Sequence, residues 1–526
     1  MSEKATPKVP YSYHTFFFPF LWNDRQRGKG FLQREAFLKC IDKKRWLEDF
    51  GYSEINSNDN EFIAQFNQYR YFNRAARNAI YTADGKESVV YNYRYNLASF
   101  GKNSSDSKWL NSEKGSNNPA RYIISKDGRT VSLAINGIRL KLFNTGIGML
   151  IFELENYDYP DKDDFNWISD RGRRIYMPYM VNGGGCYDCA DEITLSYNDK
   201  VISTSKLIKP YSKYYNIELA EPIIYLLSNG EYSVTADAQK ATDKTMYIEP
   251  IIDDRMFVAG YYINKEFASE LTEHTDNGYR FLADASQRRI SDKKNSAAEW
   301  YRAVFVDGGS CSCQSQDMLY DMISEHTYDR WAEYGSLTGI SEYSMITVTG
   351  SADDYLARNF LTEYVEMMIL VLAQRASLLS FERMLSDSAM GKRDICEIQG
   401  YYVKFQSQLL LKEVTPQQQG IELYNMLLDN LFIQEQAEEI EKQIEALSVQ
   451  KSSKSEKREN LILFLLAILG IFDAVNCIAD WNVDGGFNWL RFGASAAISV
   501  LAIFLYNNWF KRLIFFVKRL IINIKK

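Results

Sequence analysis

The sequence has few of the residues that carry most enzyme chemistry. Histidine occurs three times in 526 residues, at His14, His274 and His326, far apart along the chain. No Ser/His/Asp set, His-Glu-x-x-His pattern or other nucleophile motif stands out. Residues 143–148 hold two glycines before an apolar stretch, but no Gly-Lys-Ser/Thr follows, so they do not match a phosphate-binding P-loop. We therefore predict that the protein is not an enzyme.

An excess of basic charge is also lacking. The chain has 61 Lys and Arg against 68 Asp and Glu, a net charge of -7. Nucleic-acid binding proteins usually carry a basic face, so we expect no direct nucleic-acid binding. Residues 1–10 do not show the basic and then apolar pattern of a secretory signal.

Two long apolar runs lie near the C-terminus. Residues 461–479 contain one charge, Asp473, and residues 492–510 contain none. Each run is about 19 residues long, enough for a helix to cross a bilayer core of roughly 30 Å. Because the backbone must satisfy its own hydrogen bonds in lipid, two adjacent runs predict a transmembrane helical hairpin. The alternative is a buried helical hairpin in a soluble core.

The charges around these runs predict an orientation. Basic residues flank the pair on both outer sides, at Lys451, Lys454, Lys457, Arg458, Lys511, Arg512, Lys518, Arg519, Lys525 and Lys526. The loop between the runs holds one basic residue, Arg491. By the positive-inside rule, both termini are cytoplasmic. The basic and apolar tail, residues 511–526, is then expected along the inner leaflet of the bilayer.

The remaining chain predicts a mixed α/β cytoplasmic domain over residues 1–350. Residues 121–155 give the clearest strand pattern, with hairpin signals at Asp127-Gly128 and Asn136-Gly137. Residues 223–227 and 256–263 are further predicted strands, and residues 61–82 a predicted helix.

Long helices are predicted for residues 351–458. Residues 355–389 have almost no Gly or Pro and are apolar on most turns, which indicates a buried helix. Residues 394–413 form a second predicted helix. Residues 417–450 form a third, with apolar residues at heptad spacing. We expect this stalk helix to continue into the first apolar run, so that residues 459–510 hold the two spans.

The order of these parts resembles that of the CorA-type divalent-cation transporters. The resemblance covers the topology of the last third well, and residues 328–344 look like those of divergent CorA-like proteins. It implies a homopentamer whose stalk helix continues into a pore-lining first span, with a divalent cation as the transported ion. The family's Gly-Met-Asn signature is replaced here by residues 473–477. Asn476 stands where the signature asparagine would, so magnesium selectivity is not implied.

Divergent CorA-like proteins of this kind are similar to effectors encoded beside type III CRISPR systems. That likeness implies an antiviral-defence role and a nucleotide second messenger, a conjugate of S-adenosylmethionine and AMP. We accordingly expect a ligand-regulated ion channel or transporter of the inner membrane. The alternatives are a nucleotide sensor that its two spans only tether, and a membrane-bound enzyme.

The predicted pore is built around Asp473. An acidic side chain at membrane depth is costly unless it faces a polar interior. At about 100° per residue, a stripe of the helix collects positions that would line a cation pathway, with an apolar constriction at Leu466. The predicted lining residues are Glu459, Leu466, Asp473, Asn476 and Asp480. The alternative is that Asp473 reaches water at the outer interface.

Two clusters in the cytoplasmic part are candidate sites. Arg171, Arg173 and Arg174 follow an Asp-rich stretch, and guanidinium groups suit bidentate binding of phosphate. Surface ion pairs are the alternative interpretation of that cluster. Four cysteines on two glycine-rich turns could hold a structural zinc ion if the fold brings them together: Cys186, Cys189, Cys311 and Cys313. A redox-active Cys-x-x-Cys and isolated reduced thiols are the alternatives.

Overall fold

The computed structural model describes residues 9–23, 41–49, 60–82, 88–100, 116–175, 179, 181–182, 186–206, 219–237, 240, 242, 244–252, 255–292, 294–484 and 493. It divides the chain into two compact units, Met1–Glu441 and Lys442–Lys526. The helices up to residue 441 belong to the same unit as the sheet.

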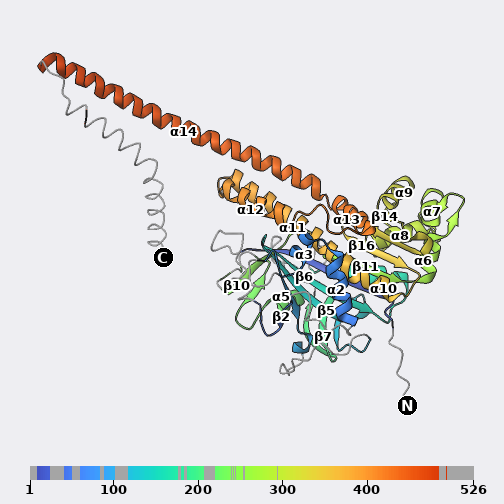
Figure 1. The fold of residues 1–526 in the computed structure, drawn as a ribbon. Coiled ribbons are helices and arrows are strands. Elements are labelled where there is room, and N and C mark those ends of the chain that lie inside the picture. Colours follow the sequence, from blue (N-terminus) through green and yellow to red (C-terminus); the bar gives the residue numbers. More distant parts are fainter. Residues whose placement is uncertain are drawn as a thin grey trace. The chain divides into compact units, whose positions relative to one another are not determined.

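A mixed sheet organises the first unit (Figure 1). Within the described residues it has 14 strands. The main path runs, in spatial order, through β14 (Thr327–Tyr328), β15 (Ser336–Ile340), β16 (Ser344–Thr349), β11 (Phe257–Ile263), β1 (Ser12–Asn23), β6 (Ile147–Asn156), β5 (Arg129–Phe143), β4 (Ala120–Lys126), β7 (Glu192–Tyr197) and β8 (Lys200–Lys206). Four further strands join its flanks, β2 (Trp46–Glu48), β3 (Val90–Tyr95), β9 (Ser233–Thr235) and β10 (Thr245–Pro250). The predicted mixed α/β domain is confirmed.

The described residues also form a series of helices. They are α2 (Asn60–Tyr71), α3 (Arg74–Ile80), α4 (Lys162–Gly172), α5 (Glu221–Leu227), α6 (Lys265–Thr272), α7 (Arg280–Gln287), α8 (Ser296–Val304), α9 (Gln316–Glu325), α10 (Asp354–Asn359), α11 (Val365–Ala389), α12 (Ile395–Gln408), α13 (Gln418–Asn430) and α14 (Ile433–Asp484). Residues 223–227, predicted as a strand, lie in α5. The apolar run is too short for periodicity to distinguish strand from helix, and Pro222 suits a helix start.

One predicted hairpin is wrong and another is confirmed. Asp127 and Gly128 both have positive φ, as a tight turn between β4 and β5 requires. Asn136-Gly137 is instead a bulge inside the continuous strand β5, where the register with β6 shifts. A side chain at Gly137 would overlap the carboxylate of Glu153 on the neighbouring strand. Gly137 is therefore explained by close packing and not by a turn.

The two faces of the sheet bury different layers. On β11, Tyr262 stacks on Phe165 of α4, with ring centroids 4.8 Å apart, whereas Tyr261 contacts Phe360 on the opposite side at 5.3 Å. Successive side chains of a strand point to opposite faces. The sheet is therefore covered by α4 on one face and by the segment that leads into α11 on the other.

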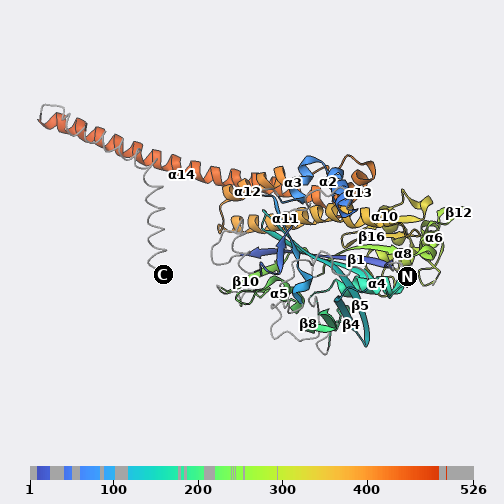
Figure 2. The ribbon, with the colours of Figure 1, turned by 60° about the horizontal axis from the view of Figure 1, so that its bottom comes forward.

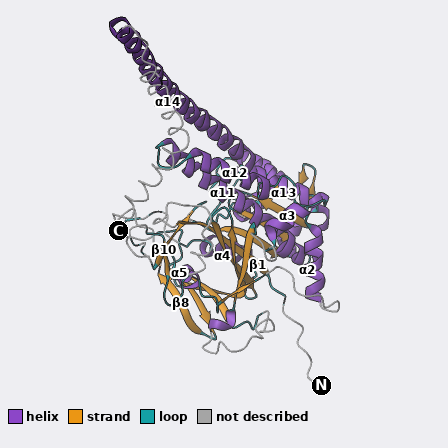
Figure 3. Cartoon of the chain, turned by 60° about the vertical axis from the view of Figure 1, so that its left-hand side comes forward, coloured by secondary structure: helices purple, strands orange, loops and turns teal. Residues whose placement is uncertain are grey.

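Helix α11 is the predicted long buried helix. It has 25 residues, and most of its side chains are buried. It contacts β1 and β6 on one side and α3, α12 and α13 on the other, an arrangement that Figure 2 shows. Figure 3 separates the strands, in orange, from these purple helices. A short π-helical segment, Phe360–Tyr364, precedes α11.

Helix α14 confirms that the stalk helix continues into the first apolar run. Its 52 residues are helical from Ile433 to Asp484, through the charged segment before residue 461. Its first turns are packed, with Ile433, Ala437 and Ile440 buried. The predicted third helix nevertheless begins as the separate α13, because Phe432 takes a positive φ that interrupts it. The second apolar run, residues 492–510, lies outside the described residues apart from Gly493.

Among the described residues, one helix passes a length-and-composition test for a membrane span, and it is Tyr355–Ala389. Most of this segment is buried against the sheet and the other helices of the first unit. Core helices of soluble domains pass the same test, so this segment is the core helix of the α/β unit.

Candidate functional site

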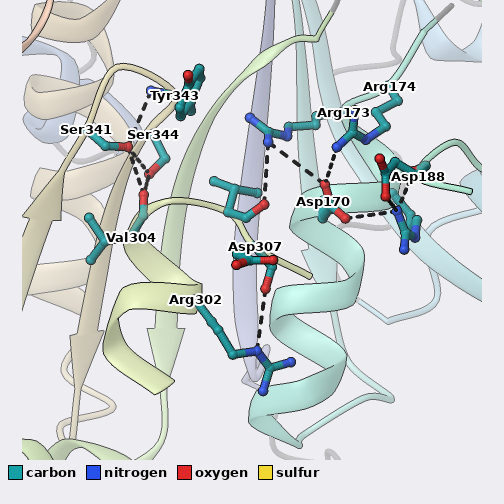
Figure 4. Close-up of polar contacts among 12 residues, drawn as sticks. Asp170, Arg173, Arg174, Asp188, Arg302, Val304, Asp307, Ser341, Tyr343 and Ser344 are labelled. Carbon is teal, nitrogen blue, oxygen red and sulfur yellow. Dashed lines mark hydrogen bonds and ion pairs between the residues drawn. The ribbon is translucent and has the colours of Figure 1, made fainter. Parts of the chain in front are cut away.

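The three predicted arginines meet at the C-terminal end of α4. Asp170, in the last turn, accepts from Arg174 Nη2 at 3.0 Å and lies 3.0 Å from Arg171 Nη1. Arg173 Nη2 is 3.9 Å from the same carboxylate. Figure 4 shows Arg173 and Arg174 turned toward Asp170. The fold therefore brings the cluster together, around one buried acid.

Arg171 is further tied to the loop that carries the first cysteine pair. Its Nη1 donates to the backbone oxygen of Asp188 at 2.5 Å, and Tyr179 donates to the Asp188 carboxylate. Burial alone would raise the pKa of Asp188, but the Tyr179 hydroxyl and the charges of Arg174 and Arg171 outweigh it and lower that pKa. These contacts match the ion-pair interpretation of Arg171.

Arg173 faces a different partner, the ring of Tyr343. It is a buried residue, 2 % exposed, and its Nη2 donates to the backbone oxygen of Val306 at 3.4 Å. Its guanidinium carbon lies 5.6 Å from the centroid of the Tyr343 ring. Arg255 approaches the same ring at 4.8 Å. Two cations within about 6 Å of one ring form a cation–π arrangement.

These three residues line a small hollow at the sheet. It measures about 250 Å³, including space open to solvent, and its lining also includes Glu342, Met256 and Phe257. Arg174 and Arg255 are opposite each other in an antiparallel bridge, and the amide of Met256 donates to the carbonyl of Arg173 at 2.8 Å. The hollow is thus formed where the chain after α4 meets the start of β11.

The position of Tyr343 is fixed by the turn between β15 and β16. Ser341 Oγ donates to the carbonyl of Val304 at 2.8 Å, and Ser344 Oγ donates to the same oxygen. The carbonyl of Tyr343 accepts from the amide of Val258 at 3.0 Å. Figure 4 shows both serines gathered at Val304. Three polar contacts therefore hold the backbone of the turn that carries Tyr343.

The four predicted zinc ligands are buried thiols on two separate loops. Cys311 Sγ contacts the carbonyl of Cys313, and Cys313 Sγ the carbonyl of Ser315. Over the part of the chain that the structure describes, which includes Cys186 and Cys189, no three His, Cys, Asp or Glu side chains form a group able to hold a metal ion. The predicted four-sulfur site is therefore not formed.

The predicted pore residues share one helix. The backbone of α14 includes Glu459, Leu466, Asp473, Asn476 and Asp480. Glu459, Leu466, Asp473 and Asp480 follow one another at seven-residue intervals. On a straight α-helix, two positions seven residues apart differ in direction by only about 20°. The side chains of Asp473, Asn476 and Asp480 lie outside the described residues.

Sequence reasoning found Arg173 but missed Arg255 and Tyr343. Residues 173, 255 and 343 come from the end of α4, the start of β11 and the β15–β16 turn, each more than 80 positions from the next. Spacing along the sequence does not show that these residues meet, because their contact depends on the order of the strands in the sheet.

No family model, curated protein or solved structure matches the chain.

Proposed function

We propose that this protein is a ligand-regulated, CorA-like ion channel or transporter of the inner membrane. The cytoplasmic α/β unit would bind a nucleotide second messenger, and α14 would carry the response into the bilayer as the first of two spans. Both chain ends would be cytoplasmic. The expectation of an antiviral-defence effector rests on the resemblance of the chain order to CorA-like effectors.

The surface of α14 is the observation that supports this proposal most directly. Large apolar side chains are exposed there, including Leu463 at 57 %, Phe464 at 61 % and Ile471 at 64 %. Full burial of such a side chain is worth roughly 1.5–3 kcal/mol, and at this exposure about half of that free energy is forgone. Helix α11 is also apolar, but most of its side chains are buried within the first unit. The apolar side chains of α14 have no such cover among the described residues.

The spread of the exposed residues favours a bilayer over a single protein partner. At about 100° per residue, Leu461, Leu463, Phe464, Leu465, Ile468 and Ile471 cover an arc of about 200°. The apolar stripe with which a helix packs on one neighbour is narrower, from about 100°. A surface this wide suits lipid on one side and other membrane helices on the other.

A channel of this kind has to be an oligomer. One two-span subunit cannot enclose a pore, so closed symmetry around the first span is needed. We propose a homopentamer, by the resemblance to CorA-type transporters. In that assembly the stripe through Glu459, Leu466, Asp473 and Asp480 would face the axis. Mass photometry in detergent that finds a stable monomer would remove the channel proposal.

Ion flux into liposomes, with and without the nucleotide conjugate, tests the function. Asp473→Asn should lower cation flux, because it removes the charge but keeps the size and polarity of the side chain. Asp473→Leu should lower it further, by adding an apolar constriction. Glu456→Gln, at an exposed position of the same helix before the apolar run, is the matched control and should conduct like the parent.

The outcome also separates the channel from a tethered sensor. If parent liposomes show no flux while the protein still binds the nucleotide, the two spans only anchor it. If both Asp473 variants conduct like the parent, Asp473 does not line the pathway.

A further inference from the structure

We infer that the hollow between Arg173, Arg255 and Tyr343 is the seat for a phosphoryl group of a nucleotide. This inference rests on the proposed regulation by a nucleotide, and it names where that ligand would bind. Of the three arginines in the predicted cluster, only Arg173 would contact the ligand, together with Arg255. Arg171 and Arg174 then position the cluster through Asp170.

The charge of the hollow is the first argument. The antiparallel bridge sets Arg174 and Arg255 opposite each other, and like charges in such pairs destabilise a sheet. Two guanidiniums line the hollow itself, those of Arg173 and Arg255, and Arg174 lies outside it. Asp170 lies 3.0 Å from Arg174 but 3.9 Å from Arg173. Guanidiniums gathered at an open hollow raise the local concentration of anions and suit phosphate oxygens.

The rigidity of the site is the second argument. Tyr343 holds Arg173 and Arg255 at 5.6 and 4.8 Å from its ring, and the Ser341 and Ser344 hydroxyls fix its turn on Val304. A site whose side chains are already ordered loses less entropy when a ligand binds. Long arginine side chains otherwise lose about 2 kcal/mol of rotamer freedom when they are fixed.

The remaining lining narrows the ligand class. The hollow opens to solvent, and Arg173, Arg255 and Tyr343 all line it. A phosphoryl group would meet the two guanidiniums there, with the rest of the ligand lying outside the opening. Glu342 in the lining would repel a bare anion but would accept from a hydroxyl or amino group. A phosphate ester with hydrogen-bond donors fits both features, and a nucleotide has them.

Equilibrium binding to the full chain in detergent tests the seat. The probes are the four ribonucleoside 5′-monophosphates, the S-adenosylmethionine–AMP conjugate, adenosine and inorganic phosphate. We expect at least one nucleotide to bind, and adenosine and inorganic phosphate to bind at least about tenfold more weakly. Arg255→Gln should weaken nucleotide binding by about tenfold or more, because it removes a charge-assisted contact.

A matched control separates the seat from a general loss of charge. Arg45 lies 4.9 Å above the Tyr225 ring, nearly the distance of Arg255 from Tyr343, but outside the hollow. Arg45→Gln should therefore bind nucleotide like the parent. Tyr343→Leu should weaken binding as Arg255→Gln does, and circular dichroism should show both variants folded.

Three results would overturn the inference. They are no binding of any nucleotide probe by the parent, unchanged affinity in folded Arg255→Gln, and adenosine binding as tightly as its 5′-monophosphate. These results are distinct from failure of the channel proposal. Nucleotide-dependent flux with unchanged affinity in Arg255→Gln removes the seat alone, and nucleotide binding at the seat without flux removes the channel alone.

Discussion

Lys141 Nζ on β5 lies 2.8 Å from Glu366 Oε2 on α11, and each side chain is only 4 % exposed. Arg139 Nη1 reaches the other oxygen of Glu366 at 2.6 Å. Burial alone would raise the pKa of Glu366, but the charges of Lys141 and Arg139 outweigh it and lower that pKa. The central helix is therefore joined to the sheet by an ionised carboxylate between two cations.

Removing that carboxylate should destabilise the protein more than removing one cation. Glu366→Gln leaves Lys141 charged and buried with no opposite charge at its former contact, a situation that costs roughly 3–5 kcal/mol. Lys141→Met leaves Glu366 paired with Arg139 and should cost less. Thermal unfolding of the full chain in detergent at neutral pH should order the midpoints as parent, Lys141→Met, Glu366→Gln. Equal midpoints for the two variants would contradict this arrangement.

His14 should make the protein sensitive to acid. Burial lowers the pKa of His14 to about 3, and its ring nitrogens contact the hydroxyls of Ser12 and Ser169 at 2.9 and 3.1 Å. The unfolded chain takes up this proton near pH 6.5, but the folded chain does not. Stability from this group is complete above pH 6.5 and declines as the pH falls toward 3, by up to about 1.4 kcal/mol per pH unit.

Unfolding midpoints measured between pH 7 and pH 4 check this sign. His14→Gln should flatten the decline relative to the parent, although its stability at pH 7 should be lower. If both proteins lose stability equally over that range, the imidazole is not the group that resists protonation.

Glu363 should give stability a pH dependence opposite in sign to that from His14. It is buried in the π-helical segment before α11, and burial raises its pKa despite the hydrogen bond from Thr362 and the charge of Arg358. A carboxyl group with a raised folded pKa stabilises fully below its unfolded pKa near 4.3, and this stabilisation is lost as the pH rises. Glu363→Gln should therefore unfold at a higher temperature than the parent at pH 8. The gain should shrink toward pH 4.5, and a gain independent of pH would argue against this cause.

Two glycines should respond in opposite directions to alanine. Gly137→Ala places a methyl group against the Glu153 carboxylate, which is held at 2.7 Å by Arg139 Nε, so it should lower the unfolding midpoint. Gly400 lies inside α12 with open space around it. Gly400→Ala should raise the midpoint, since alanine stabilises a helix interior by about 1 kcal/mol relative to glycine. A lower midpoint for Gly400→Ala would contradict the open space at that position, and an unchanged midpoint for Gly137→Ala would contradict the close packing there.

Periodic, local features of this fold could be predicted from the sequence. The long core helix follows from residues 355–389, which are apolar on most turns and nearly free of glycine and proline. The β4–β5 turn follows from Asp127-Gly128, where the required backbone conformation depends on those two residues alone. The continuation of the stalk into the apolar run follows from a segment without helix breakers.

Features that depend on distant neighbours could not be predicted. Asn136-Gly137 carries the same local signal as a turn, but the Glu153 side chain on the next strand makes it a bulge. Residues 223–227 are too short for their period to be decisive, and packing makes them a helix. The four cysteines share a motif-like spacing, but their loops do not bring the sulfurs together.

The candidate site divides in the same way. The grouping of three arginines after an Asp-rich stretch could be predicted from the sequence, because they are neighbours in the chain. The tertiary structure places all three arginines around Asp170 and also brings Arg173 together with Arg255 at the ring of Tyr343. The physical reason is strand order. The bridge between residues 174 and 255 and the placement of β16 beside β11 bring together residues that no local spacing connects.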